Sequence, residues 1–583
     1  MVHATAAPQA AHEHTNVMDR RLHRRGLLAG TTAAAMLAAL RGTGLSASAA
    51  AQDAGEPTRG GKAVIALIQE PGQMNPFFNV QSGSFLSTLA LDPLFVPDAD
   101  GNYLPVLAAE VPTLENGGIS EDFLTITYKL RDGITWSDGE PFTADDVVFS
   151  FEIYKNPEST TALGTAYELI ESVTAIDPLT VEVKMSDINP AYLTLWDSEG
   201  PVQPKHLFES SAVTQEHPLA RLPVGTGPFV FTDWKTGDEI TLTRNEKYRD
   251  PERPYLDGVT IKITPEKETA IASFIAGEFD TIYFITTGDL PTLSAAQEAG
   301  DGIVVALQEG PSHVEWLWLN MSDNGDPGKP HPVLGDPAIR EAMDHGIDRQ
   351  TVIDEVLGGF GYQVGSFIYA GWAAVDIPAA TYDPALANSL LDEAGWVMGD
   401  DGVRVKDGVR ASLRYQTIAG DQTRELYQQV VQQNMKDIGI ELVIENVPSN
   451  TIFGSWEEGG IFMRGDYDIL MSRAGYFVDP ASWAKDFTSD QIPSDEFPGG
   501  FNRVRYQSEA FDEAVNAAAQ TLDQAVRGEA YTTAAQQFAA DRPSLPLYSS
   551  AWGWTWNERL QGVDTAFWEG MWPSSAGWYV NEG

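Results

Sequence analysis

The chain contains no cysteine, and this absence excludes several kinds of chemistry at once. Without cysteine there is no disulfide, no thiolate zinc or iron–sulfur site, and no cysteine nucleophile. There is also no cysteine that could carry a lipid anchor. We therefore expect a protein that is not anchored to a membrane as a lipoprotein.

Positive charge is also scarce. The chain has 37 Lys and Arg against 83 Asp and Glu, which gives a formal net charge of −46. Because a surface this acidic repels phosphate groups, we expect neither nucleic acid nor an anionic membrane surface as a partner. We interpret the charge as an adaptation for solubility or salt. The alternative is an acidic face that attracts cationic ligands.

Long hydrophobic runs are missing, and the longest candidate lies in an apparent export signal. Arginine pairs at 20–21 and 24–25 precede an uncharged run, 26–40, and the small-residue stretch "SASAAAQ" follows. The run is too short and too rich in Ala and Gly for a spanning helix of about 20 apolar residues. "HRRGLLAG" resembles a twin-arginine signal. We predict that residues 1–51 are a twin-arginine-like signal peptide, with Met1 or Met18 as the start.

The rest of the chain alternates strand and helix patterns. "KAVIALIQ" and "HVEWLWLN" predict buried strands, and "FLTITYKL" alternates as a strand with one buried face. "DPAIREAMDHG" begins with Asp336 as N-cap and Pro337 at the first helical position. "TRELYQQVVQQNMKDIG" predicts a helix with Leu426, Val431 and Met435 on its buried face. These patterns, and a length of 583 residues, predict a mixed α/β chain of several domains.

Enzyme signatures are missing as well. We find no H-E-x-x-H, G-x-S-x-G, P-loop or G-x-G-x-x-G motif. Histidines beyond the predicted signal have no spacing that would place two on one helix face, so we predict no metal site. The turns "DADGN" and "SDNGDPG" lack the glutamate that a calcium loop needs. No catalytic residue and no cofactor is predicted.

The acid-rich stretch "KLRDGITWSDGEPFTADDVVFSFE" is the strongest candidate for a carboxylate cluster. Each acid also has a structural explanation. Asp132 and Asp138 stand in Asp-Gly turns, and Thr143 with Asp146 fits a capping box at the start of a helix. Asp145 lies at the positive end of the same helix dipole. We therefore favour turns and a helix cap over catalysis.

The same stretch resembles the signature segment of the large extracellular solute-binding proteins of ABC importers, the oligopeptide/dipeptide/nickel-binding family (family 5). Further resemblances follow in order along the chain, including "PVGTGPFVFTDW", "LTRNEKY", "AIREAMDHGIDRQTVIDEVLGG", "YDPALANSLLDEAGW" and "SLPLY". They extend from about residue 61 to the C-terminus. The missing lipid-anchor cysteine departs from many members of such families and argues for a freely soluble protein.

The resemblance implies a two-lobed periplasmic-binding-protein clamshell with an extra domain inserted in lobe I. Fold analogy does not identify the ligand. On this sequence the implied divisions are lobe I at 60–97, 203–311 and 546–583, the inserted domain at 98–202, and lobe II at 312–545.

The resemblance also implies ligand residues. "GYFVD" matches a segment whose aspartate pairs with a peptide α-ammonium, here Asp479, with Gly475 and Tyr476 before it. The alternative is that Asp479 only caps the following helix. Arg473 and Arg464 are candidate partners for a ligand carboxylate, or surface ion pairs. Tryptophans near the expected cleft could stack on a ligand or pack in the core; the candidates are Trp372, Trp483 and Trp552.

We therefore predict a substrate-binding component of an ABC importer that is not an enzyme. It would capture a small solute, most plausibly a peptide, between its lobes and deliver it to a membrane permease. It would act as a soluble monomer on the periplasmic or extracellular side of the cell envelope. The alternative within the family is an oligosaccharide- or metal-chelate-binding receptor, and outside it a secreted hydrolase.

Overall fold

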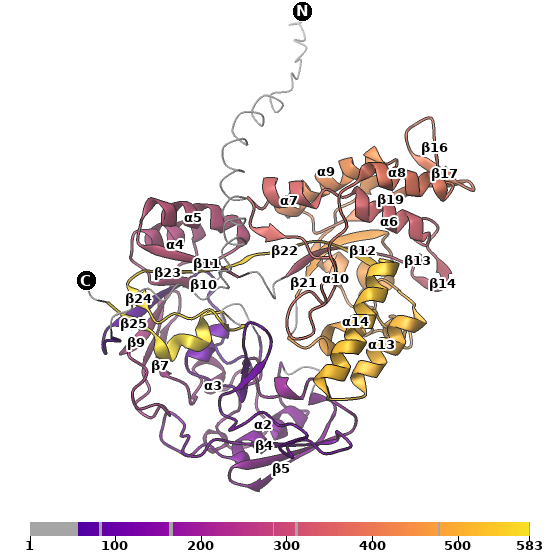
Figure 1. The fold of residues 1–583 in the computed structure, drawn as a ribbon. Coiled ribbons are helices and arrows are strands. Elements are labelled where there is room, and N and C mark those ends of the chain that lie inside the picture. Colours follow the sequence, from indigo (N-terminus) through magenta and orange to yellow (C-terminus); the bar gives the residue numbers. More distant parts are fainter. Residues whose placement is uncertain are drawn as a thin grey trace, which may run out of the picture.

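The computed structural model describes residues 56–80, 84–162, 167–283, 285–308, 313–475, 478–568 and 570–581. The predicted signal peptide and Tyr476 lie outside the described residues. Three sheets with their helices organise the described chain (Figure 1).

The first lobe is built on a seven-stranded sheet. Its strand order is β11 (Ile303–Gln308), β23 (Trp552–Asn557), β10 (Thr281–Tyr283), β1 (Lys62–Leu67), β9 (Gly258–Ile263), β8 (Glu239–Arg244) and β7 (Phe229–Lys235). β1 runs parallel to both β9 and β10, whereas β23 is antiparallel to β10 and β11. Helices α4 (Lys267–Ile275) and α5 (Leu290–Ala299) cover one face (Figure 1). The predicted strand "KAVIALIQ" is confirmed as β1.

The second lobe is built on a six-stranded sheet. Its order is β15 (Gly361–Tyr362), β22 (Ser544–Ser550), β12 (Val314–Leu319), β21 (Ile469–Ala474), β19 (Ser412–Gln416) and β20 (Glu441–Ile444). Every residue of β12 is buried, as its largely apolar sequence predicted, because helices cover both faces of this sheet. The one charged residue of the strand, Glu315, pairs with Arg424. Leu317 and Leu319 belong to one core cluster, and Trp316 and Trp318 to the other.

Helices of the second lobe divide between these two faces (Figure 1). On one side lie α6 (Pro337–Gly346), α7 (Arg349–Glu355), α8 (Pro384–Glu393) and α9 (Gln422–Asp437). On the other lie α13 (Glu509–Ala519) and α14 (Gln524–Asp541), with the short helices α10 (Ser449–Phe453), α11 (Ile461–Arg464) and α12 (Ala481–Ala484).

Helix starts in the second lobe follow the sequence closely, but one helix face does not. Asp336 accepts from the Ala338 amide at 3.0 Å, as predicted for the N-cap of α6. The predicted buried face of α9 is partly wrong, because Leu426 is 53% exposed. Tyr427 takes the buried position together with Val431 and Met435. This stripe keeps the helical spacing of four residues, which places Leu426 a quarter turn away from it.

A three-stranded unit makes up the third part of the structure. It contains β4 (Thr125–Lys129), β6 (Thr180–Met185), β5 (Ile170–Asp177) and helix α2 (Ala144–Lys155), around one core cluster. The β2–β3 hairpin (Phe95–Pro97 and Tyr103–Pro105) packs on that core. The remaining short elements are α3 (Pro218–Arg221), β13 (Ser322–Asp323), β14 (Asp326–Pro330), β16 (Val397–Met398), β17 (Arg404–Lys406), β18 (Val409–Arg410), β24 (Leu560–Gln561) and β25 (Tyr579–Val580), with several 3₁₀ turns.

The predicted domain ranges follow these sheets, with differences at two edges. All strands of the seven-stranded sheet fall in the ranges predicted for lobe I, and β4 to β6 fall in the predicted insertion. The predicted boundary at 545/546 lies inside β22, because that strand continues to Ser550. The boundary at 97/98 separates the two strands of the β2–β3 hairpin. The domain division itself remains a prediction.

Asp468, just before β21, is hydrogen-bonded to Arg414 in the neighbouring strand β19. Its lowered pKa predicts how the stability of the second lobe depends on pH. Arg414 donates to it from the backbone amide at 2.7 Å and from the guanidinium at 3.1 Å, and His331 Nε2 lies 3.5 Å away. Burial alone would raise the pKa of Asp468, but the bonds from His331 and Arg414 lower it from 3.8 to about 2. The charged form is therefore favoured in the folded state, so its stabilising contribution is present above about pH 4 and is lost between pH 4 and 2.

We expect Asp468→Asn to lower the free energy of unfolding at pH 7 by about 2 kcal/mol and to flatten its decline between pH 4 and 2. Urea titrations across that pH range measure both. Asp466→Asn is the matched control, because Asp466 also pairs with Arg414 but its side chain is 65% exposed. An unchanged acid slope in Asp468→Asn would contradict the assignment.

Candidate functional site

The carboxylates of the acid-rich stretch form local bonds at the start of α2. Asp146 accepts from the Thr143 amide at 2.9 Å, which forms part of the predicted capping box, and from the Lys205 amide at 3.0 Å. Asp138 pairs with His206 at 2.7 Å, and Asp145 lies 3.7 Å from Lys205. Burial raises the pKa of Asp146, against these hydrogen bonds. The bonds are those of turns and a helix cap.

Asp479 lies just before α12, and its carboxylate is held by a neighbour within the second lobe. Arg527 Nη2 donates to Asp479 Oδ1 at 2.5 Å, and Nη1 donates to Oδ2 at 2.9 Å. The Ala481 amide also donates to Oδ1, at 2.9 Å. Both members of the ion pair are buried. The helix-start bond considered from the sequence is present, beside an ion pair that the sequence did not predict.

Aromatic rings surround the Arg527 guanidinium. Its central carbon lies 5.0 Å from the Trp372 ring centre and 5.5 Å from the Tyr531 ring centre. Nη2 also donates to Tyr531 Oη at 3.2 Å. Burial alone would lower the pKa of Arg527, but the charge of Asp479 holds it above its usual value. Two predicted ligand residues therefore meet at Arg527: Asp479 pairs with its guanidinium, and Trp372 stacks against it.

Two tyrosines bring the three-stranded unit to this ion pair. Burial, and after it the charge of Asp479, raises the pKa of Tyr103 well above its usual value. Burial also raises the pKa of Tyr192 to about 12, while the charges of Arg527 and Asp479 act on it in opposite directions. Both phenols are therefore neutral at neutral pH. Sequence reasoning missed both, because Tyr103 lies in the segment "PLFVPDADGNYLPVLAAEVP", which predicts only a hairpin, and Tyr192 lies outside the motifs.

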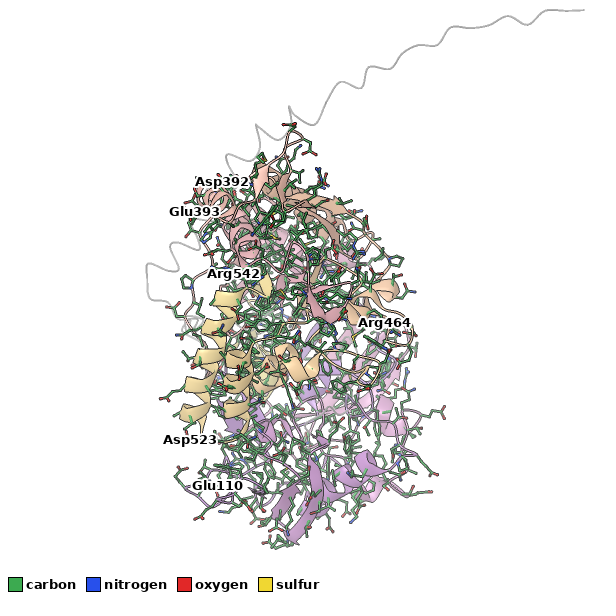
Figure 2. The ribbon with its side chains drawn as sticks, turned by 90° about the vertical axis from the view of Figure 1, so that its right-hand side faces the viewer. Glu110, Asp392, Glu393, Arg464, Asp523 and Arg542 are labelled. Atoms are coloured by element: carbon green, nitrogen blue, oxygen red, sulfur yellow. The ribbon has the colours of Figure 1, made fainter. Side chains whose placement is uncertain are left out.

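The second lobe and the three-stranded unit touch around these residues. A Cβ built on Gly101, in the β2–β3 hairpin, would lie 3.4 Å from Gly371 Cα and 3.5 Å from the Trp568 ring. Gly101 also has φ +81°, which favours glycine. Leu522, just before α14, packs in the core cluster of the three-stranded unit. In Figure 2, Asp523 at the start of α14 is drawn at the end of the yellow helices that approaches the violet ribbon.

A second group lies where the chain passes between the two large sheets. Arg473, at the end of β21, is exposed, and β12 places Glu315 opposite it. Burial, with a smaller contribution from the Arg473 charge, lowers the pKa of His313 to about 4, so that imidazole is neutral at pH 7. The His313 ring centre lies 6.4 Å from that of Trp552. The structure therefore brings two predicted ligand residues, Arg473 and Trp552, to either side of His313.

The other predicted residues differ in their surroundings. Gly475 is exposed, and a Cβ added there would meet nothing within 4 Å. Trp483 is 6% exposed and packs against Trp316 and Trp318, which matches the core role considered for most tryptophans. Arg464 stacks on the Trp456 ring at 3.9 Å and pairs with Asp495 at 3.4 Å, as a surface ion pair would.

Arg527 is the main site residue that sequence reasoning missed. It stands 48 residues from Asp479 and lies in a helix whose pattern predicts only a buried stripe. One signal was present. A lone arginine on the apolar face of a helix needs a buried acid as its counter-ion. Asp479 was the one acid among the predicted ligand residues, so it was the natural partner to consider.

Two features are absent from the described residues, a metal-binding cluster and a membrane-spanning helix. Among them, no group of three or more His, Asp or Glu side chains is arranged to hold a metal ion. Across the same residues, no helix is long and apolar enough to span a bilayer.

Two sheet-based lobes, with polar and aromatic residues gathered where they meet, define a binding protein that encloses a small solute between its lobes. The chain belongs to the bacterial extracellular solute-binding proteins, family 5, because the family model (the "Middle" region) matches residues 102–492, more than half of its length. The resemblance recognised in the sequence is thereby confirmed.

Curated relatives agree with this assignment. The chain is 28% identical over 526 residues to the oligopeptide-binding protein AppA of Bacillus subtilis, covering 88% of this chain and 91% of the relative. It is also 28% identical to protein XP55 of Streptomyces lividans, covering 89% of each.

Solved structures share the fold. AppA of Bacillus subtilis, in complex with a nonapeptide, is 25% identical with a TM-score of 0.64, covering 90% of this chain and all of that one. NikA of Brucella suis, in complex with Fe(III)-EDTA, is 22% identical with a TM-score of 0.73, covering 89% of this chain and all of that one. The predicted fold, mixed α/β with two lobes, is confirmed.

The position of the acid-rich stretch gives a test. We expect Asp145→Asn combined with Asp146→Asn to lower the free energy of unfolding by about 1 kcal/mol, because the helix loses its cap and a favourable dipole interaction. Affinity for solute should stay unchanged. Urea denaturation and a binding titration measure the two quantities. Asp145→Asn alone is the control and should have little effect, since Asp145 is exposed. Loss of affinity at unchanged stability would make the stretch part of the site.

Proposed function

We propose that this protein is the substrate-binding component of an ABC importer, and that it captures a peptide between its lobes and delivers it to a membrane permease. The observation that carries this proposal is the buried polar group at the meeting of the lobes. There Asp479 pairs with Arg527 of the second lobe, and the charge of Asp479 contributes to the raised pKa of Tyr103 in the β2–β3 hairpin. The likeness to AppA, which is named for oligopeptide binding, supports a peptide as the solute.

The mechanism requires no covalent chemistry. Solute that contacts both lobes binds the closed arrangement better than the open one, so it shifts the population toward closure. The permease would then recognise the closed form. We further propose that the protein is not an enzyme, that it acts as a monomer, and that residues 1–51 direct it by a twin-arginine route to the outer side of the membrane.

Arg473 supports a place for a ligand carboxylate. It is an exposed cation at the end of β21, and no hydrogen bond or ion pair is recorded for its side chain among the described residues. Beside it, His313 is neutral at pH 7 and Trp552 is half-buried. Glu315, opposite Arg473 on the neighbouring strand, is buried and pairs with Arg424. A guanidinium binds a carboxylate through two parallel hydrogen bonds. In a peptide, this group would be the C-terminal carboxylate or an acidic side chain.

A metal chelate or an oligosaccharide is the second candidate. The fold similarity to NikA holding Fe(III)-EDTA favours a chelate, whose carboxylates would also suit Arg473. The half-buried rings of Trp372 and Trp552 would suit stacking on a sugar or a chelate face. A secreted hydrolase is disfavoured, since the carboxylates that we located are engaged in caps, turns and ion pairs.

Native mass spectrometry of the protein purified from its own cells tests the proposed function. We expect bound species whose masses resolve into amino-acid residues. A metal complex or a sugar of defined mass would overturn the peptide assignment and favour the second candidate. The same spectrum, recorded after refolding from denaturant, provides the solute-free reference.

The role of Arg473 has its own test. We expect Arg473→Gln to weaken binding of peptides with a free C-terminal carboxylate by about tenfold or more and to leave C-amidated peptides unaffected. Isothermal titration with matched peptide pairs measures this difference. Arg464→Gln is the control, because Arg464 already pairs with Asp495 on the surface. Equal loss for both peptide forms would contradict carboxylate recognition by Arg473.

A further inference from the structure

The carboxylate of Asp479 has little capacity left for a ligand cation. Oδ1 accepts from both Arg527 Nη2 and the Ala481 amide, and Oδ2 accepts from Arg527 Nη1. The guanidinium is thus bidentate, the strongest geometry for this pair. Asp479 and Arg527 are 6% and 4% exposed, so water does little to screen them from each other. Together they form a neutral unit.

Arg527 is fixed independently of the first lobe. It lies in the first turns of α14, which begins with Asp523 as N-cap. Tyr531, one turn later on the same helix, accepts from Arg527 Nη2, and the Trp372 ring lies under the guanidinium. All of these residues belong to the second lobe. The ion pair therefore persists when the lobes separate to admit solute.

An ammonium group would gain nothing by approaching this unit. If Arg527 stayed in place, the cluster would hold two cations and one anion in a buried site. If Arg527 were displaced, its guanidinium would remain without a counter-ion, which is strongly unfavourable. The other titratable groups that face the site are Tyr103, Tyr192, Tyr531 and Asp197. Asp197 accepts from the Glu199 and Gly200 amides through Oδ1.

Two buried donors near the ion pair lack an acceptor. Arg527 Nε and Tyr103 Oη are inaccessible to solvent and have no hydrogen-bond partner among the residues that the structure describes. One comes from the second lobe and one from the β2–β3 hairpin. Burying a donor without an acceptor is costly, so an oxygen atom that reached either donor would be stabilised by it. Carbonyl, carboxylate and hydroxyl oxygens meet this requirement, and an ammonium does not.

We propose that Arg527 sets the specificity of this site: the solute end that lodges at Asp479 carries an oxygen acceptor and no ammonium group. For a peptide solute, this means a blocked amino terminus or an internal carbonyl. The proposal rests on the proposed function in taking the solute to be a peptide. Arg527 excludes the amine, and Asp479 acts by holding Arg527 in place.

The test is a competition between two forms of one mixed library of short peptides, with free or N-acetylated amino termini. The refolded, solute-free protein is offered both at equal concentration, and native mass spectrometry records which form is bound. We expect the wild type to favour the acetylated form. Arg527→Gln leaves Asp479 without its cation, and we expect its preference to shift toward free amines by about tenfold or more.

Three further variants make the test specific. Arg527→Met combined with Asp479→Asn removes both charges and the Nε donor, so it should fold without a buried lone ion and lose most of the preference between the two peptide forms. Arg527→Lys keeps a cation beside Asp479, so it should not shift toward free amines as Arg527→Gln does. Arg542→Gln changes another arginine of the second lobe, one that caps the opposite end of α14 and pairs with Asp344, and should have no effect (Figure 2).

The outcomes separate this inference from the proposed function. A wild type that favours free amines overturns the inference and leaves the peptide function standing. If the wild type binds neither form but Arg527→Gln binds free amines, the exclusion by Arg527 stands and the peptide function falls. If neither protein binds either form, both fall.

Discussion

Motion of the two lobes is constrained by the way in which the last strands of the chain join them. β22 belongs to the six-stranded sheet and β23 to the seven-stranded sheet, and only Ala551 separates them. β11 and β12 make the same passage in the opposite direction. Because the strands on both sides of Ala551 are hydrogen-bonded into their sheets, a change in the angle between the lobes would have to be absorbed at or beside this residue. Such a connection favours rotation about a hinge line through it over translation.

That constraint decides where a solute can act on closure. Trp552 begins β23 and His313 precedes β12, so the Arg473 group lies beside the hinge line. Asp479 follows the end of β21 by five residues, and its ion pair meets Tyr103 at the contact with the three-stranded unit. A solute that contacts both Arg473 and the Asp479–Arg527 ion pair would extend from the hinge line toward the contact between the second lobe and the three-stranded unit. Arg473 and Asp479 both belong to the second lobe, so coupling to closure would come from contacts of the same solute with Trp552 of the first lobe and Tyr103 of the hairpin.

The scarcity of positive charge also has a structural side. The buried arginines that the structure describes lie in the second lobe: Arg340, Arg349, Arg404, Arg424, Arg505 and Arg527. Arg404, for example, donates to the Ile438 and Trp396 carbonyls and pairs with Asp392, thereby joining α8, β17 and the end of α9. Five acids of the described residues are buried as well, namely Asp92, Asp146, Asp280, Glu315 and Asp479, so burial leaves the net charge of the surface almost unchanged. On so acidic a surface, an exposed cation such as Arg473 is one of few positive groups that would attract an anionic ligand.

The sequence predicted local structure well wherever the cause was local. The caps at Asp336 and Asp146 depend on residues within one turn, and the buried strand β12 on its own largely apolar sequence. Leu426 was misplaced because neighbouring apolar residues can be assigned to two helix faces until the partner surface is known. The boundary inside β22 was missed because the strand continues past the motif that marked its start.

The residues proposed to decide specificity depend on contacts between parts of the chain that are distant in the sequence. The segments that identified the family are largely turns, caps and core strands, which serve any solute and can stay the same while the ligand changes. "GYFVD" placed Asp479 correctly at the second lobe, but its chemistry depends on Arg527 from a helix 48 residues further along the chain. The same carboxylate can bind an amine when alone or hold an arginine when paired. In this chain a guanidinium already occupies the place beside Asp479, so the chemistry of that carboxylate follows from Arg527.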